Sequence, residues 1–276
     1  MGTRERITFT SLPFLRGIEA VSGEDVTNVF GKHIHATCIV GRVQKGVRMI
    51  SHDGDEVRIP CGDLFVVNPG LVHACTSGEG GAHSYALLSI ASSVLARVAS
   101  QISERAEPGV WFEGVHRTHG MISRRLGDFF EMLSDPLSPS FEKESHLYTL
   151  LAEIVLAFAQ APPEVCRVGR QQGAMARVRS YIQAHHDAPI SLASLSDVAC
   201  LSPFHLQRLF TFHYGISPHR YVTHYRIAEA RKLLVKGAAI GDAALATGFS
   251  DQSHLTRHFK RVVGTTPGRF IQANRS

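Results

Sequence analysis

HLQRLF at residues 205–210 and HLTRHF at residues 254–259 repeat one pattern 49 positions apart, near the end of the chain. The similarity extends outward from these hexapeptides at the same offset. The further aligned pairs are Ala199 with Gly248, Ser202 with Asp251, Gly215 with Gly264, Pro218 with Pro267, and Arg220 with Arg269. Similarity at a fixed spacing indicates a duplicated structural unit. Two copies are too few for a solenoid, so the sequence predicts a paired module.

The first copy predicts two short helices joined by a tight turn. Ser191 is a suitable N-cap for a helix that ends at Ala199. Ser202 then caps a second helix, and Pro203 stands at the first helical position, where no intrahelical N–H bond is lost. This second helix is expected to stop near Gly215.

The second copy repeats this layout. A helix is expected from Ile240, a turn at the small Gly248, and a second helix that Asp251 caps and that ends near Gly264. Two short helices joined by a tight turn, the second properly capped, form a helix-turn-helix unit. The sequence therefore predicts two such units in one all-α domain.

The second helix of each unit has an apolar face and a polar face. Leu206, Leu209 and Phe210 share the apolar face in the first copy, as Leu255 and Phe259 do in the second. Arg can pair bidentately with guanine and Gln with adenine, while Thr or an aromatic ring can touch the thymine methyl group. The candidate base-contacting residues are Phe204, Gln207, Arg208, Thr211, Gln252, Ser253, Thr256 and Arg257. The alternative is an ordinary exposed polar face, which two copies in register make the weaker reading.

The segment between the two units is expected to be one helix. Residues 218–236 have a helical apolar period, and at 1.5 Å per residue they span about 28 Å. Neighbouring major-groove segments on one side of DNA lie about 34 Å apart. A rigid helix of this length can hold two reading helices about one DNA turn apart, so one chain can read two adjacent groove segments.

Charge is distributed unevenly along the chain. The 276 residues are 44% hydrophobic and 19% charged, as in ordinary soluble globular proteins of one large or two smaller domains. From residue 174 onward there are 13 Lys and Arg against 5 Asp and Glu, whereas the preceding part has 16 against 19. A basic C-terminal third favours a polyanion as its partner, although a solvated charged face would give the same composition.

Residues 174–276 resemble the DNA-binding domain of the AraC/XylS family of bacterial transcription regulators. The resemblance lies in LSDVACLSPFHLQRLF, RIAEARKLL and ALATGFSDQSHLTRHFKRVVGTTPGRF. It implies base contacts from both recognition helices, promoter DNA and RNA polymerase as partners, and a small-molecule effector. Basic residues outside the reading faces are expected to contact phosphates. These are Arg220, Lys260, Arg261 and Arg269.

The N-terminal part is expected to be a small β-barrel or sandwich. Short β-rich runs follow one another from about residue 5 to 90, and Asp53 with Gly54 between two such runs predicts a hairpin. PCGDLFVVNPGLVHACTS at residues 60–77 resembles the cupin-type barrel that this family uses for effector sensing. The expected fold class is therefore α+β, with a cupin-like barrel and flanking helices followed by an all-α domain.

Three histidines are candidates for a site in this barrel. His33 and His35 would point to one face of a strand, and His73 could meet them across the barrel. Three imidazoles suffice for zinc, nickel or iron, and Cys75 could be a fourth ligand. The alternatives are a polar effector pocket that needs no cofactor, and partly solvated residues at the barrel mouth. Metal cupin enzymes usually carry a glutamate shortly after HxH, whereas this chain has Cys38 and Ile39 in that neighbourhood.

Two apolar helices are expected between the barrel and the DNA-binding domain. MISRRLGDFFEML and HLYTLLAEIVLAFAQ each keep apolar residues on one helical face. The stripe of the second helix would expose an apolar patch on a monomer, and with this patch the resemblance to the AraC/XylS family implies a homodimer through this helix. It comprises Leu147, Leu151, Ile154 and Phe158. The stripe could instead pack against the barrel or the neighbouring helix that contains Phe129.

The expected organisation is a sensing domain with dimerisation helices over residues 1–160, a linker over 161–173 with two prolines, and a DNA-binding domain over 174–276. The N-terminus has no signal-peptide pattern, and no apolar run reaches the length of a membrane span. Five cysteines without a CxxC pair favour a reducing cytoplasm.

Together these features predict a cytoplasmic, ligand-responsive transcription regulator that is not an enzyme. One competing class is a cupin metalloenzyme fused to a nucleic-acid-binding tail, which a full set of metal ligands would favour. Another is an architectural DNA-binding protein with a vestigial barrel, which would show no dependence on a ligand.

Overall fold

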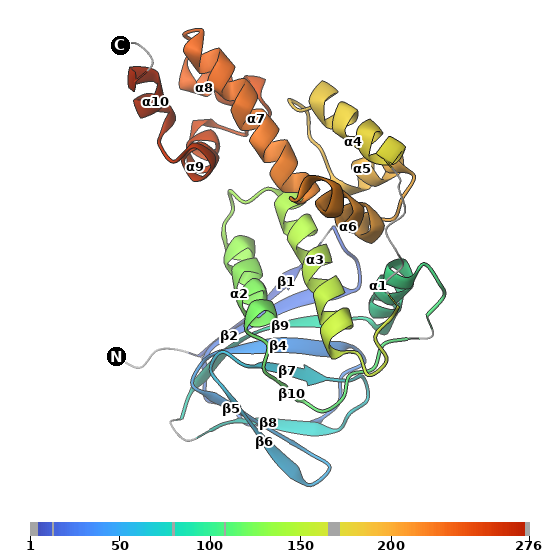
Figure 1. Ribbon diagram of the computed structural model, residues 1–276. Helices are drawn as coiled ribbons and strands as arrows, with labels where there is room; N and C mark the ends of the chain where they lie inside the picture. The colour runs from blue at the N-terminus through green and yellow to red at the C-terminus, as the bar shows by residue number, and fades with distance from the viewer. Residues whose placement is uncertain (1–4, 13, 79–80, 108, 165–171, 274–276) are drawn as a thin grey trace. The chain divides into compact units, whose positions relative to one another are not determined.

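The structure is a computed structural model that describes residues 5–12, 14–78, 81–107, 109–164 and 172–273 (Figure 1). The chain divides into two compact units. The first comprises Met1–Pro136 and His146–Cys166, and the second comprises Leu137–Ser145 and Arg167–Ser276. All of the described strands belong to the first unit, whereas the second is helical. The expected α+β class is confirmed.

Two antiparallel sheets form the body of the first unit (Figure 1). The six-stranded sheet has the order β1 (Arg6–Ser11), β2 (Ile18–Val26), β9 (His83–Ile90), β4 (Cys38–Lys45), β7 (Leu64–Val67) and β10 (His116–Arg117). The four-stranded sheet has the order β3 (Phe30–His33), β8 (His73–Ser77), β5 (Val47–His52) and β6 (Asp55–Pro60). Along the chain, β2 to β5 and again β6 to β9 alternate between the two sheets, as in a small barrel or sandwich.

The predicted hairpin joins β5 to β6. Asp53 and Gly54 form its two-residue loop, with φ of 52° and 91°. Positive φ at both central positions is the mark of the type I′ turn, which matches the twist of the flanking strands. The two sheets then share one apolar core, because alternate residues of each strand point inward. This core comprises Val26, Ile39, Val43, Ile50, Ile59, Phe65, Val67, Cys75 and Tyr85.

Three helices accompany the sheets: α1 (Ser92–Ser103), α2 (Gly120–Ser134) and α3 (Ser140–Phe158). The helix α2 packs on β4 and β9 and buries Ile122, Leu126 and Phe129, as its period predicts. The proposed dimerisation stripe on α3 is not an exposed patch. Leu147, Leu151 and Ile154 are fully buried within the single chain, and Phe158 is 6% exposed. The premise for dimerisation through this stripe was therefore wrong, since one chain already removes these side chains from water.

The second unit contains two helix-turn-helix motifs and a connecting helix. Its helices are α4 (Gln172–Ala184), α5 (Leu192–Ala199), α6 (Pro203–Tyr214), α7 (Pro218–Val235), α8 (Ile240–Ala246), α9 (Gln252–Val263) and α10 (Pro267–Ala273). The predicted caps are present. Ser202 and Asp251 accept hydrogen bonds from the third residue of α6 and α9, and Gly215 and Gly264 end these helices in the left-handed conformation.

Arg226 of the connecting helix α7 fastens the two motifs to each other. Its Nε and Nη2 atoms donate to the carbonyls of His186 and Ala188, at 2.6 and 2.7 Å, in the segment that leads into α5. The same guanidinium lies at the α8–α9 turn, where a Cβ added to Gly248 would come within 2.9 Å of it. The turn of the second motif therefore rests directly on the entry to the first.

The sequence also led to expectations about the linker, the cysteines and membrane spans. Residues 165–171 of the expected linker lie outside the described residues, as does Cys166. The four cysteines that are described, Cys38, Cys61, Cys75 and Cys200, are free. Within the described part of the chain, no helix is both long and apolar enough to cross a membrane.

Candidate functional site

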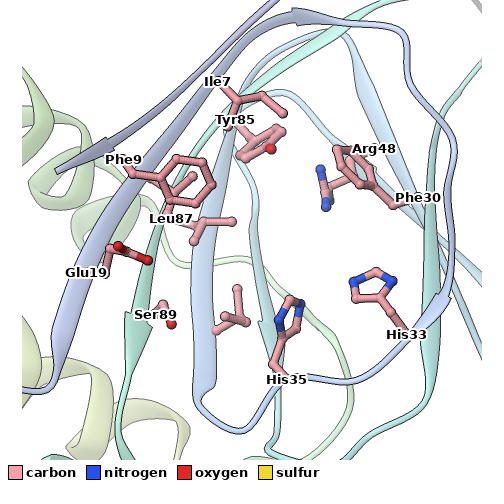
Figure 2. A pocket seen from close by; sticks show the side chains of 12 residues that line it. Ile7, Phe9, Glu19, Phe30, His33, His35, Arg48, Tyr85, Leu87 and Ser89 are labelled. Carbon is pink, nitrogen blue, oxygen red and sulfur yellow. The ribbon is translucent and has the colours of Figure 1, made fainter.

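A cavity of about 210 Å³ lies within the first unit (Figure 2). Its apolar wall includes Phe9, Phe30 and Leu87. Polar groups also line it, and Figure 2 shows the rings of His33 and His35 directed into the same space as the guanidinium of Arg48, with Glu19 on the side of Phe9. A mostly apolar cavity with a few converging polar groups is the usual form of a small-molecule site.

The three candidate histidines come together beside this cavity. His33 lies directly opposite His73 where β3 pairs with β8. His35 lies two residues beyond the end of β3, and its carbonyl accepts a hydrogen bond of 2.9 Å from the N–H of Gly70. The ring centroids lie 4.3 Å apart for His33 and His73, 4.9 Å for His33 and His35, and 5.1 Å for His35 and His73. The strand pairing and the turn at Gly70 therefore produce the cluster.

Backbone carbonyls select the tautomer of two of these rings. His33 Nδ1 lies 2.7 Å from the carbonyl oxygen of Gly31, and His73 Nδ1 lies 2.9 Å from that of Leu71. A carbonyl only accepts, so each Nδ1 must carry the proton and donate it. In the neutral ring, Nε2 then keeps its lone pair. Burial lowers the pKa of His35 to about 4 and also lowers that of His73, so both are neutral near pH 7.

Cys75 is not part of this cluster, although the sequence suggested it as a fourth ligand. The three histidines each offer a nitrogen atom, and these atoms lie within 4.8 Å of one another. Cys75 instead pairs with Phe30 and packs in the core between the sheets. Burial raises the pKa of its thiol, which keeps it protonated and a poor ligand.

Arg48 is a further site residue that the sequence analysis missed. Its side chain is on β5 and the residue is only 6% exposed. The guanidinium lies over the rings of Tyr85 and Phe65, 4.6 and 5.0 Å from their centroids. Arg48 and Ile50 share one parity on the strand, so a charged residue at a core-facing position was the available signal.

The side chain that accepts a hydrogen bond from Arg48 is a neutral histidine. Nη1 of Arg48 lies 2.8 Å from Nε2 of His83, which must accept because arginine only donates. Burial, and then the charge of Arg48, lower the pKa of His83 to about 4. The Nε atom of Arg48 is buried without a hydrogen-bond partner. Among the described residues, no carboxylate forms an ion pair with Arg48.

The candidate base-contacting residues of α6 are unequally accessible. Thr211 is exposed and Arg208 is half-buried, whereas Phe204 and Gln207 are buried, contrary to the outer face that was expected. The amide of Gln207 donates to the carbonyl and hydroxyl oxygens of Ser145, at 3.2 and 2.7 Å, in a segment of the same unit. A buried amide needs such partners, and a phenyl ring such as that of Phe204 gains by leaving water.

The corresponding residues of α9 are more open. Gln252 and Ser253 are exposed, and Thr256 and Arg257 are half-buried. The Arg257 guanidinium donates to the carbonyl of Leu137 at 2.8 Å, within the same unit. The four expected phosphate contacts, Arg220, Lys260, Arg261 and Arg269, are all exposed. Arg261 also lies 3.6 Å from Glu142.

Comparison with known families matches both parts of the chain. Residues 16–152 match the AraC-like ligand binding domain, and residues 195–273 match the helix-turn-helix domain of this class. The uncharacterized HTH-type transcriptional regulator YbfI of Bacillus subtilis is 29% identical over 86% of this chain and 86% of its own length. The chain belongs to the AraC family of transcription regulators.

Two further proteins are similar to parts of this AraC-family chain. The HTH-type transcriptional regulator GlxA of Rhizobium meliloti is 32% identical over 54% of this chain and 44% of its own length. The crystal structure of an AraC family regulator from Rhodopseudomonas palustris is 29% identical over 38% of this chain and 99% of that chain, with a TM-score of 0.35. A TM-score this low adds nothing to the family match.

The AraC-family assignment fixes the class of function. A ligand-binding domain joined to a helix-turn-helix domain, in a chain whose relatives are transcriptional regulators, makes the protein a ligand-responsive, DNA-binding transcription regulator. The fused metalloenzyme considered from the sequence finds no support among these relatives.

Proposed function

We propose that this regulator reads two adjacent major-groove segments of promoter DNA with α6 and α9. The carrying observation is the duplication: each helix has an acceptor cap at its start and a left-handed glycine at its end. The connecting helix α7 lies between them, with Arg226 bonded to the segment before α5. A rigid pair of reading helices needs no second chain to cover two groove segments.

Sequence is read by a subset of side chains on these two helices. We assign base contacts to Arg208 and Thr211 on α6 and to Gln252, Ser253, Thr256 and Arg257 on α9. Phe204 and Gln207 can contribute only after a rearrangement that exposes them, because both are buried. Arg220, Lys260, Arg261 and Arg269 contact phosphates, since they are exposed cations outside the two reading faces.

The effector binds in the cavity beside His33, His35 and His73. An apolar wall for the body of a small molecule and imidazoles for its polar groups support this assignment. A sensor works only if ligand binding differs in free energy between the DNA-competent state and the other state. We expect effector binding to change operator affinity by about 1–3 kcal/mol.

We assign the domains, location and partners of the protein in accordance with this function. Residues 1–160 form the sensing domain, residues 161–173 the linker, and residues 174–276 the DNA-binding domain. The protein acts at promoters in the cytoplasm, has no catalytic activity of its own, and contacts RNA polymerase, as the family resemblance implies. We also infer a homodimer, as the family resemblance implies, and the buried side chains of the α3 stripe do not form its interface.

Sequencing of captured DNA tests the proposal. Purified full-length protein is mixed with random DNA, with and without a metabolite extract, and the retained fragments are sequenced. We expect one sequence motif whose recovery changes when the extract is present. Retention of DNA without a motif would contradict sequence-specific regulation, and a motif indifferent to every extract fraction would contradict effector sensing.

The link between the histidines and the response has its own test. In His73→Ala, the response of the captured motif to the active extract fraction should be lost, while its binding without the extract remains. An unchanged response would remove His73 from effector binding, and the same test on His33→Ala and His35→Ala decides for the two histidines that line the cavity.

A further inference from the structure

We propose that His33, His35 and His73 form a binding site for a divalent transition metal, with zinc as the best fit, and that its open position faces the cavity. Three imidazoles with one remaining position are an established arrangement for Zn²⁺. Metal binding by these three side chains does not depend on the proposed function, whereas a part for the metal in effector sensing rests on it.

The distances between the rings suit one ion. With Zn–N bonds of about 2.0–2.1 Å, tetrahedral geometry separates the ligand nitrogens by about 3.4 Å and the ring centroids by roughly 5 Å. The observed centroid separations are 4.3, 4.9 and 5.1 Å, and the candidate ligand atoms lie within 4.8 Å of one another. Small ring rotations are therefore enough to bring three nitrogens onto one ion.

The outer contacts of the rings are those of metal ligands. A histidine that binds a metal through one nitrogen commonly donates its other N–H to a backbone carbonyl, which fixes the tautomer and the ring plane. His33 and His73 each make this contact, to Gly31 and Leu71. In both rings the Nε2 lone pair is the one left for an ion. Two of the three ligands are thus preset in the tautomer that binds.

Metal titration of the full-length protein tests this site. Protein made without a histidine tag is stripped with chelator, and Zn²⁺ alone is added in a calorimeter. We expect one equivalent to bind, and His33→Ala and His73→Ala to weaken binding by about tenfold or more. The matched control is His52→Ala, a neighbouring histidine of β5 outside the cluster, which should bind as the wild type does.

Two outcomes would overturn the metal site. One is wild-type protein that takes up no stoichiometric Zn²⁺, which no folding defect of a variant could explain. The other is unchanged affinity in a folded His73→Ala protein. Capture of a DNA motif by the same stripped protein separates the metal site from the proposed function. If the metal-free protein still captures the motif and responds to the extract, the regulator function stands even where the metal site fails.

A second inference rests on a different observation, the buried cation Arg48. We propose that the effector is a small carboxylate whose anionic group pairs with Arg48 and whose apolar body lies against Phe9 and Leu87, across the cavity (Figure 2). This inference deepens the proposed function and rests on it. A buried charge is costly unless it is paired and hydrogen-bonded. Arg48 is only 6% exposed, it lines the cavity, and its Nε atom has no hydrogen-bond partner.

Glu19 lines the same cavity, but neither it nor any other described carboxylate forms an ion pair with Arg48. His83 accepts its hydrogen bond as a neutral ring, and the rings of Tyr85 and Phe65 lie beside the guanidinium. A guanidinium holds a carboxylate by two parallel N–H donors, so one ligand group would satisfy both the charge and the free donor. Phe9, Phe30 and Leu87 then favour an aliphatic or aromatic body over a highly hydroxylated one.

Paired ligands test the charge requirement. The panel is acetate, hexanoate and benzoate, each beside its uncharged amide, and the readout is the thermal shift of full-length protein. We expect at least one carboxylate to raise Tm more than its amide does. The difference should vanish in Arg48→Met and persist in Arg58→Met, which removes an exposed arginine from the adjacent strand β6.

The free protein gives a second readout. Ligand-free Arg48→Met loses the hydrogen bond to His83 and the contacts with Tyr85 and Phe65, so its Tm serves to establish that the variant is folded. The inference is contradicted if no carboxylate exceeds its amide, or if the difference survives in a folded Arg48→Met protein. If the wild-type protein captured no DNA motif, that result would instead count against the regulator function.

Discussion

The two helix-turn-helix motifs have the same plan but differ in what supports it. Both reading helices begin with an acceptor cap, at Ser202 and Asp251, and both end at a glycine. The helices in front of them differ: a capping box at Ser191 starts α5, whereas no side chain caps α8. The repeat therefore preserves the reading helix, and its surroundings have diverged. Variants at the positions where the two motifs differ can therefore test each motif separately.

The largest expected difference concerns the turn inside each motif. The second motif turns at Gly248, with φ of 78°, where an added Cβ would lie 2.6 Å from the backbone oxygen of His186. The left-handed conformation costs alanine about 1–2 kcal/mol, and the clash adds to this. We expect Gly248→Ala to lower the free energy of unfolding by about 3 kcal/mol in urea titrations.

The first motif supplies the matched control for this change. It turns at Cys200, a non-glycine residue with φ of 55°. Cys200→Gly should be neutral or slightly stabilising, because glycine adopts this conformation without strain. Equal losses in the two variants would mean that the turns do not differ as described.

A smaller difference follows from one buried position of the reading helices. Leu209 of α6 is fully buried, and the equivalent residue of α9 is His258, only 3% exposed. Burial is the first cause that lowers the pKa of His258 to about 3, and it does the same for His219 on α7. The groups facing them are His254, Arg226, Arg257, Arg261 and Glu142.

These histidines make the second motif sensitive to acid. The folded pKa lies below the unfolded value of 6.5, so the unfolded chain binds more protons as pH falls. Their stabilising contribution is complete above pH 6.5 and is lost as the pH falls toward 3. We expect the wild type to lose about 1 kcal/mol per histidine between pH 7.5 and pH 5.5.

The variant His258→Leu gives α9 the leucine that α6 has at the equivalent position, Leu209. It should retain more stability at pH 5.5 than the wild type does, and its loss between the two pH values should be smaller by the share of one histidine, about 1 kcal/mol. Urea unfolding at both pH values measures this. An unchanged pH dependence in His258→Leu would contradict a role for this buried imidazole.

The smallest expected difference concerns the glutamines. Gln252 is exposed, whereas Gln207 is buried and bonded to Ser145. On a captured DNA site, Gln252→Ala should weaken binding by about tenfold, the value of one bidentate base contact. Gln207→Ala should have a smaller effect, because contact with a base would first break the bonds to Ser145. Fluorescence anisotropy compares them, and equal losses would show that Gln207 reads DNA as well.

Local patterns in the sequence predicted much of this molecule. The caps at Ser202 and Asp251, the turn at Gly248 and the hairpin at Asp53 and Gly54 all depend on neighbouring residues, and the structure has them. These features depend on residue type and short spacing, which a sequence displays directly. The meeting of His33 with His73, 40 positions apart, was anticipated through the resemblance to a cupin-type barrel.

Burial by distant segments was not predictable in the same way. The stripe on α3 has the period of an interface, yet only the folded chain shows that it is covered. Gln207 has the side chain of a base reader, but Ser145, far away in sequence, takes its amide. Arg48 was overlooked because a charged residue on a strand suggests solvent, and its burial depends on rings from other strands.

The central claim is that α6 and α9 read separate DNA segments, and comparing the sites captured by wild type, Arg208→Ala and Arg257→Ala tests it most directly. The wild-type motif should contain two informative segments centred about 10 bp apart. Each arginine variant should lose about 1–3 kcal/mol and relax preference in a different segment, whereas Lys260→Ala should lower affinity uniformly and reduce the salt slope. A single informative segment, or relaxation of the same segment by both arginine variants, would contradict the two-headed reading.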